Sequence, residues 1–185
     1  SLSCTNENSF RQLVLGMRML IPFEHAACLM QHRTGSGPIA GFDFINISYP
    51  AEWTQQYARN NYHLIDPIFR QNFSTFSLQY WKNTYRQHPP PKQFVRDAED
   101  VGLRQGYTIG LSSRAGTEGS LFSFGGNTLP EESRIEVIMR HLTPHLHEAF
   151  LRVLRRDETN QHRAAPLSPR EREVLSWVKE GKSTW

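Results

Sequence analysis

The sequence predicts an α+β fold in which an antiparallel sheet of about five strands lies between helical layers, as an α-β-α sandwich. Three observations predict it: helical apolar periodicity near both ends, two pairs of β-rich segments with short connections, and short helices between the pairs. With 185 residues, 38% of them hydrophobic, and a mean hydropathy of -0.57, the chain is typical of one globular domain plus a small appendage.

The first segments of the chain alternate between helical and extended patterns. Apolar residues recur at three- and four-residue steps and predict a helix over 7–21. The apolar stretch 25–31 and the alternating stretch 39–47 flank a turn-like connection over 34–38, which predicts a hairpin.

Two short helices are expected next. One begins with Pro50 at its first position, where the missing N–H is not needed, and it carries Trp53 and Tyr57. The pair Asp66-Pro67 begins the other, and a loop rich in polar residues is expected to follow.

The second half repeats this alternation. Three prolines after His88 end regular structure, and the next helix is expected to end at Gly106. The β-rich runs 107–113 and 120–125 predict a second hairpin. A long helix begins after Pro130, with a bend expected at an internal proline.

The charge distribution and the cysteine content limit the possible binding partners and the cellular compartment of the protein. Residues 1–151 hold 13 basic and 13 acidic residues, whereas residues 152–185 hold 8 and 5, so the net charge of +3 lies at the C-terminal end. A polyanion would bind there, although a solvated helix face explains the same pattern. Two cysteines, no secretion signal and no long apolar run predict a cytoplasmic protein without a membrane segment. The sequence starts without Met and stops at Trp185, which indicates a processed or trimmed chain.

Enzyme and metal signals are weak. His141, His145, His147 and Glu148 form the best candidate metal cluster, but Pro144 interrupts their helix and the zinc-protease spacing is missing. We interpret these histidines as polar residues on a helix surface. No nucleophile elbow or phosphate-binding loop occurs in the sequence, so we predict no catalytic residues, no metal and no cofactor.

One constellation of aromatic residues around a carboxylate carries more information. Tyr49, Trp53 and Tyr57 follow at four-residue steps, and Asp66 lies within an apolar run. A buried carboxylate needs hydrogen-bond donors to offset its desolvation. An alternative interpretation is that Asp66 caps a helix and that the aromatic residues belong to the core.

The order of these motifs resembles the ligand-binding domain of LuxR-type quorum-sensing regulators, and the tail resembles the start of their helix-turn-helix. The matching segments are Tyr49-Pro-Ala-Glu-Trp-Thr-Gln-Gln-Tyr57, Asp66-Pro67, Trp81, Gly102-Leu-Arg-Gln-Gly106, Leu167-Ser-Pro-Arg-Glu-Arg-Glu-Val-Leu175 and Gly181-Lys-Ser-Thr-Trp185. The tail also reads independently as a capped helix, because Ser168 and Glu171 form a capping box and Gly181 ends the helix.

The resemblance implies an N-acyl-homoserine lactone held between the sheet and a helical layer. Trp53 would donate to the lactone carbonyl, Asp66 would accept from the amide N–H, and Tyr49 would donate to the acyl carbonyl. The remaining residues implied for the site are Tyr57 and Trp81 as walls, with Phe94, Leu103 and Thr108 as further lining. Two positions depart from the family. Gly110 stands where the family often has proline at a strand edge, and Phe122 stands near where many members have a small, often hydroxylated, pocket residue.

The resemblance also implies a domain organisation and partners. Residues 1–157 would bind the autoinducer and dimerise, 158–166 would be a linker, and 167–185 would start the helix-turn-helix. The complete protein would bind DNA as a homodimer, with Lys182 contacting phosphate. The alternative function is a sensor of the same fold that binds another small amphiphile or acts without a ligand.

Overall fold

A single antiparallel sheet forms the centre of the protein in the computed structural model, which describes residues 4–33 and 39–164. The strand order is β2-β1-β5-β4-β3, and every neighbouring pair is antiparallel. The two predicted hairpins are the pairs β1–β2 and β4–β5, and the pairing of β1 with β5 joins them. The strands are β1 (His25–Arg33), β2 (Ile39–Asn46), β3 (Gln79–Tyr80), β4 (Gln105–Ser112) and β5 (Glu118–Gly126).

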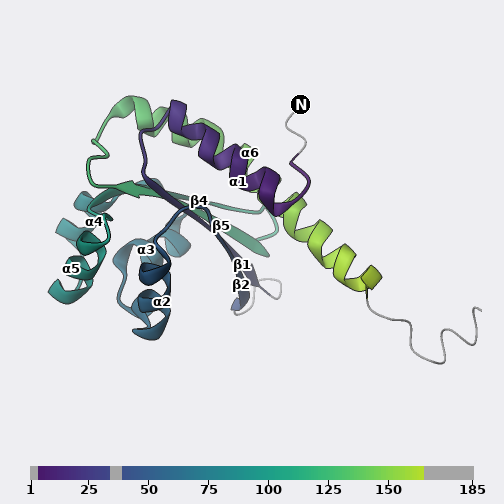
Figure 1. Ribbon diagram of the computed structural model, residues 1–185, viewed down its shortest axis with the longest axis horizontal. Helices are drawn as coiled ribbons and strands as arrows, with labels where there is room; N and C mark the ends of the chain where they lie inside the picture. Colours follow the sequence, from purple (N-terminus) through teal and green to yellow (C-terminus); the bar gives the residue numbers. More distant parts are fainter. Residues whose placement is uncertain (1–3, 34–38, 165–185) are drawn as a thin grey trace, which may run out of the picture.

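Helices cover both faces of the sheet, which confirms the predicted α-β-α sandwich. The long α6 (Ser133–Ala164) and α1 (Glu7–Gly16) lie together on one face, and α2 to α5 lie on the other (Figure 1). The second layer consists of α2 (Ala51–Arg59), α3 (Pro67–Thr75), α4 (Trp81–Gln87) and α5 (Lys92–Asp100). Two short 3-10 helices, Met17–Met19 and Tyr62–Leu64, follow α1 and α2.

The core between the sheet and the pair α1/α6 is rich in aromatic side chains. Phe10 of α1 stacks on Phe150 of α6 with 5.1 Å between ring centroids, and Phe122 of β5 lies 6.3 Å from Phe150. Phe122 therefore packs against α6 and does not line the cavity on the other face of the sheet, although the sequence analysis placed it near a pocket position. Successive side chains of a strand point to opposite faces, so its neighbour Ser123 faces the second helical layer instead.

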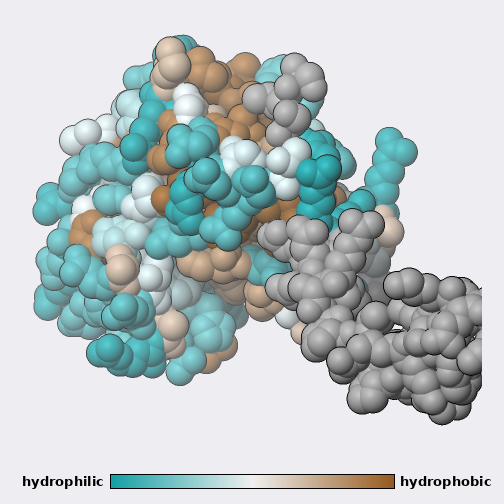
Figure 2. All heavy atoms as spheres, turned by 45° about the vertical axis from the view of Figure 1, so that its right-hand side comes forward, coloured by the Kyte–Doolittle hydropathy of each residue, from teal (hydrophilic) through white to brown (hydrophobic). Residues whose placement is uncertain are grey.

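The surface of the α1/α6 side carries exposed apolar residues. Figure 2 shows hydrophobic residues gathered in the upper part of the molecule, where α1 and α6 lie in Figure 1. Met19, which follows α1, is 90% exposed, and Val137 on α6 is 54% exposed. Apolar surface of this kind is available for contact with a partner.

Several element boundaries differ from the sequence predictions. Pro50 is the N-cap of α2 and not its first helical residue. The predicted polar loop before His88 contains the end of α3, the strand β3 and the whole of α4. The helix α5 ends at Asp100 and not at Gly106, because Gly102 takes a left-handed conformation with φ of 83° and ends it first.

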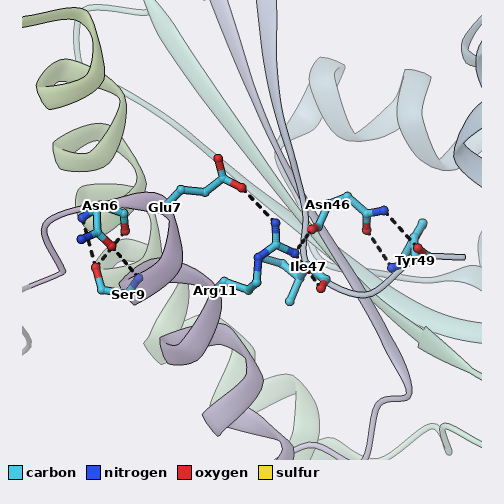
Figure 3. Close-up of polar contacts among 7 residues, drawn as sticks. All are labelled: Asn6, Glu7, Ser9, Arg11, Asn46, Ile47 and Tyr49. Carbon is cyan, nitrogen blue, oxygen red and sulfur yellow. Dashed lines mark hydrogen bonds and ion pairs between the residues drawn. The ribbon is translucent and has the colours of Figure 1, made fainter. Parts of the chain in front are cut away.

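Arg11 on α1 fixes the turn that leads from β2 into the second helical layer. Its guanidinium donates to the carbonyl oxygens of Asn46 and Ile47 and forms an ion pair with Glu7 (Figure 3). The Asn46 amide in turn accepts from the Tyr49 backbone N–H at 2.8 Å and donates to its carbonyl at 3.0 Å. The first helical layer thus holds Tyr49 at the start of α2.

The histidines of α6 do not form a metal site in the described part of the chain. His141 and His145 are exposed as expected. His147 is only 3% exposed and its Nδ1 lies 2.8 Å from the Ser120 hydroxyl of β5, so placing it on the surface was wrong. Burial lowers the pKa of His147, which favours its neutral form. None of the helices within 4–33 and 39–164 is long and apolar enough to cross a membrane.

The predicted C-terminal features lie mostly outside the described residues. The helix α6 continues to Ala164, so most of the segment 158–166, expected to be a linker, is helical. The predicted start of the helix-turn-helix over 167–185, including Lys182, lies beyond the part that the structure describes.

Candidate ligand-binding cavity

A cavity of about 280 Å³ lies between the sheet and the layer formed by α2 to α5. Side chains from β1, β2, β5 and all four of these helices line it. The structure brings seven of the eight predicted site residues to this cavity: Tyr49, Trp53, Tyr57, Asp66, Trp81, Phe94 and Leu103. The eighth, Thr108, does not line the cavity but is fully buried behind it.

Trp53 presents an unpaired donor to the cavity. It lies one turn before Tyr57 on α2, and its ring packs against Tyr57 at 5.6 Å and against Phe94 at 5.8 Å. Only 5% of the residue is exposed, yet its indole N–H has no hydrogen-bond partner among the described residues. Because indole N–H groups that are cut off from water usually find an acceptor, a ligand that fills the cavity would have to supply one to this donor.

Asp66 has two roles at once. Its Oδ1 accepts from the Ile68 backbone N–H at 2.8 Å and caps α3, with Pro67 at the first helical position. Its Oδ2 accepts from the Tyr57 hydroxyl at 2.9 Å and keeps a lone pair, since a carboxylate oxygen can accept more than one bond. The capping interpretation is therefore confirmed, and Asp66 lines the cavity as well.

Burial disfavours the ionised form of Asp66. The desolvation of the carboxylate raises its pKa to about 6, from an ordinary value of 3.8. Hydrogen bonds from Tyr57 and from the backbone of Ile68 and Phe69 act in the opposite direction. At neutral pH the group is ionised but incompletely compensated, so a further donor in the cavity would stabilise it.

A chain of hydroxyl groups lies on the sheet side of the cavity. The Trp81 indole donates to the Thr108 hydroxyl at 2.9 Å, this hydroxyl lies 2.8 Å from that of Ser123, and Tyr49 donates to Ser123 at 3.0 Å. Thr108 is fully buried and has no other acceptor among the described residues, so its own hydrogen goes to Ser123. The Ser123 hydrogen then remains free to point into the cavity.

The sequence analysis missed several residues of the cavity wall, among them Ser123, Tyr85 and Cys28. Ser123 was missed because β5 is buried on both faces, so buried and exposed residues do not alternate along this strand. Tyr85 lies one turn after Trp81 on α4, a spacing that would have identified it had this helix been predicted. Cys28 of β1 is fully buried, and burial raises the pKa of its thiol far above the usual range.

The end of the cavity near the β2 edge is apolar and aromatic. Phe44 of β2 and Phe69 of α3 line it. Phe69 packs against Phe42 at 5.8 Å and against Phe73 at 5.1 Å, so these rings support each other behind the wall. This cluster supports the apolar wall of the cavity next to β2.

The second departure noted in the sequence, Gly110, packs closely against α3. A Cβ atom there would overlap the Asn72 side-chain oxygen and lie 2.8 Å from Phe76. Gly110 does not line the cavity. Its role is to let α3, which carries Phe69 and is capped by Asp66, lie close to β4.

Comparison with known proteins identifies the family. The family model described as Autoinducer binding domain matches residues 6–151. The chain belongs to this family. The autoinducer-binding domain is similar to the transcriptional activator protein BjaR1 of Bradyrhizobium diazoefficiens, with 28% identity over 140 residues that cover 74% of this chain and 56% of BjaR1. The chain spans 56–58% of the length of BjaR1 and of two further curated relatives, VanR of Vibrio anguillarum and RpaR of Rhodopseudomonas palustris, all of them transcriptional regulators.

Solved structures agree on the fold of the autoinducer-binding domain. The N-acylhomoserine lactone dependent LuxR family transcription factor CepR2 of Burkholderia cenocepacia matches with a TM-score of 0.62 and 18% identity, over 79% of this chain and 84% of that one. SdiA of Escherichia coli in complex with octanoyl-rac-glycerol matches with a TM-score of 0.66 and 21% identity, over 96% of this chain and 72% of SdiA. At these identities the structures support the fold alone.

Proposed function

We propose that this domain senses an N-acyl-homoserine lactone for a quorum-sensing transcriptional regulator. The observation that carries the proposal is the unpaired Trp53 indole N–H in the same cavity as the incompletely compensated Asp66 carboxylate. Such a pair needs a ligand with an acceptor and a donor close together. The head group of an N-acyl-homoserine lactone supplies both, since it has a lactone carbonyl and an amide N–H.

The polar groups of the cavity pair with the head group one by one. Trp53 donates to the lactone carbonyl, and Asp66 accepts from the amide N–H through the free lone pair of Oδ2. The resemblance implies that Tyr49 donates to the acyl carbonyl, but its hydroxyl already donates to Ser123. We therefore assign this role to the free hydrogen of Ser123, which Tyr49 holds in place. Tyr57 and Trp81 form the walls, and Thr108 positions both Trp81 and Ser123 from behind.

The volume of the cavity favours a short acyl chain. At about 280 Å³ it lies at the lower end of the range for small-molecule sites, which is about 300–1,000 Å³. The acyl chain would extend along the apolar wall that the aromatic cluster around Phe69 supports. Each methylene that fits contributes about 0.8 kcal/mol, so the apolar wall sets the preferred chain length and the polar groups set the ligand class.

Ligand binding would act on transcription through stability and dimerisation. A ligand that binds only the folded state stabilises it by about 2.7 kcal/mol at a hundredfold excess over its dissociation constant. The folded domain forms a homodimer through α6 and its exposed apolar residues, such as Val137. In the complete cytoplasmic protein, a helix-turn-helix beginning within 167–185 binds DNA, and Lys182 contacts phosphate.

A second candidate is a sensor of a different amphiphile. SdiA, whose fold this chain shares, is in complex with octanoyl-rac-glycerol, a glycerol ester that has no amide N–H. A ligand of that kind would accept hydrogen bonds from the Trp53 indole and the hydroxyl groups of the cavity. It would donate to Asp66 through a hydroxyl group and not through an amide N–H.

Isothermal titration calorimetry with three ligands tests the proposal. N-hexanoyl-homoserine lactone should bind the purified chain, and its ring-opened form, N-hexanoyl-homoserine, should bind much more weakly because it brings a second carboxylate next to Asp66. Octanoyl-glycerol is the third ligand. Binding of octanoyl-glycerol without binding of any acyl-homoserine lactone would favour the second candidate and contradict the first.

A further inference from the structure

The Tyr85 hydroxyl is a polar group of the cavity that the pairing described above does not use. Tyr85 lies on α4 and lines the cavity, with its ring edge-on to Phe94 at a centroid distance of 6.3 Å. Within the described part of the chain, this hydroxyl has no hydrogen-bond partner. A hydroxyl group that a bound ligand shields from water nearly always needs one.

The Tyr85 hydroxyl acts as a hydrogen-bond donor at this position. Burial, followed by the negative charge of Asp66 and the neighbouring Tyr49, raises its pKa well above the usual range, so it keeps its hydrogen. The ring of Phe94 contacts both Tyr85 and Tyr57, and the Tyr57 hydroxyl donates to Asp66, so Tyr85 lies on the Asp66 side of the cavity. Asp66 already accepts from Tyr57 and from the backbone of α3, and it does not accept from Tyr85.

A count of donors and acceptors shows what is missing opposite Tyr85. The cavity offers three free donors, the Trp53 indole and the hydroxyl groups of Ser123 and Tyr85, beside one carboxylate acceptor. The two carbonyl groups of a simple N-acyl-homoserine lactone use only two of these donors. The third donor would be buried without a partner unless the ligand offers it a further oxygen atom, and the cost of an unpaired donor selects against a ligand that does not.

We infer that Tyr85 is a specificity-determining residue, which donates a hydrogen bond to a third acceptor oxygen of the ligand close to its amide. The inference rests on the proposed binding of an acyl-homoserine lactone. Two oxygen atoms have this chemistry: the ring oxygen of the lactone, and an oxygen on the third carbon of the acyl chain. Both lie within a few bonds of the amide that Asp66 binds.

Three ligands with the same chain length separate these two sources. N-hexanoyl-homoserine lactone is the reference, N-(3-oxohexanoyl)-homoserine lactone adds an oxygen on the chain, and N-hexanoyl-homocysteine thiolactone replaces the ring oxygen by sulfur. Their dissociation constants are measured by calorimetry for the unmodified chain and for Tyr85→Phe, which keeps the ring beside Phe94. Tyr62→Phe is the matched control, because Tyr62 belongs to the same aromatic cluster but donates to Asp97 and does not line the cavity.

The expected result is a preference that depends on the Tyr85 hydroxyl. The unmodified chain should bind the ligand with the recognised oxygen about fivefold to tenfold more tightly than its partner without it, and Tyr85→Phe should remove this preference. Loss of the preference for the 3-oxo ligand identifies the chain oxygen, and loss of the preference for the lactone over the thiolactone identifies the ring oxygen. Tyr62→Phe should keep the preference.

Two results would overturn the inference, and they differ from a failure of the proposed function. Equal affinities of Tyr85→Phe and the unmodified chain for all three ligands would show that the hydroxyl contacts none of them. An equal loss for all three would show a structural role of the hydroxyl. If the unmodified chain bound none of the three ligands, the proposed function itself would be contradicted, and the inference with it.

Discussion

Replacing Asp66 by asparagine is expected to stabilise the ligand-free protein and to weaken ligand binding. Asparagine caps helices about as well as aspartate, so the bond from the Ile68 backbone N–H to position 66 is kept. The new amide N–H can donate to the Tyr57 hydroxyl, which now donates to Oδ2. What disappears is the buried charge.

The structure gives the size and sign of the effect on stability. The pKa of Asp66 is raised from 3.8 to about 6, so ionised Asp66 destabilises the folded protein above pH 6, and this cost is lost as the pH falls from 6 to about 4. A difference of roughly two pKa units corresponds to about 3 kcal/mol. At pH 8, Asp66→Asn should therefore raise the free energy of unfolding by up to about 3 kcal/mol.

The effect on binding has the opposite sign. A hydrogen bond to a charged group contributes about 1.5–3 kcal/mol, so the affinity for the lactone should fall roughly 10- to 150-fold when the carboxylate is removed. Because the ionised carboxylate accepts a stronger hydrogen bond from the amide N–H than the protonated acid does, the unmodified chain should also bind more weakly as the pH falls below about 6. The affinity of Asp66→Asn should not change with pH in this range.

Urea denaturation at pH 5 and pH 8 and calorimetric titration at the same pH values measure both effects. His147, whose pKa is lowered by burial, destabilises the protein when it is protonated in acid, but it is present in both proteins and cancels in their difference. A lower stability of Asp66→Asn at pH 8, or an unchanged affinity for the lactone, would refute the reasoning.

Three further substitutions test other parts of the site. Trp53→Phe keeps aromatic packing but removes the indole N–H, so the dissociation constant for the lactone should rise about fivefold to tenfold in calorimetry; an unchanged constant would remove Trp53 from the head-group contacts. Phe69→Leu enlarges the apolar part of the cavity, so the acyl lactone that binds most tightly should have a longer chain. Each added methylene that fits should contribute about 0.8 kcal/mol to the binding free energy, and an unchanged preference would place the chain elsewhere. Gly110→Ala makes its Cβ overlap the Asn72 side chain and should lower the free energy of unfolding by about 1–3 kcal/mol, whereas Gly41→Ala, with open space around it, should not; equal effects in urea would contradict the packing of α3 on β4.

Local chemistry explains which elements the sequence predicted well. The pair Asp66-Pro67 begins α3 as expected, because capping and the fixed φ of proline act within a few residues. The two hairpins were predicted from β-rich runs and short connections. The helix α4 was missed because it has only seven residues and no side-chain cap, so its formation depends on Trp81 and Thr84 packing into the layer.

Tertiary contacts explain why parts of the cavity could not be predicted. Both faces of β5 are buried, so the sequence does not tell whether Phe122 or Ser123 faces the cavity. The packing of Phe122 against Phe150 on the other face of the sheet decides it. The family resemblance placed Thr108 in the lining, whereas it lies behind Trp81 as the acceptor of its indole N–H. His147 is buried because α6 packs its polar position against Ser120 of the sheet.

The central claim, that the cavity binds a short-chain acyl-homoserine lactone, is tested most directly by thermal unfolding of the chain with lactones of increasing acyl length. Mass action predicts that only a ligand of the folded state raises the melting temperature. The cavity of about 280 Å³ predicts the largest increase for short chains, with a smaller one for long chains. A melting temperature that no acyl-homoserine lactone changes would contradict the claim.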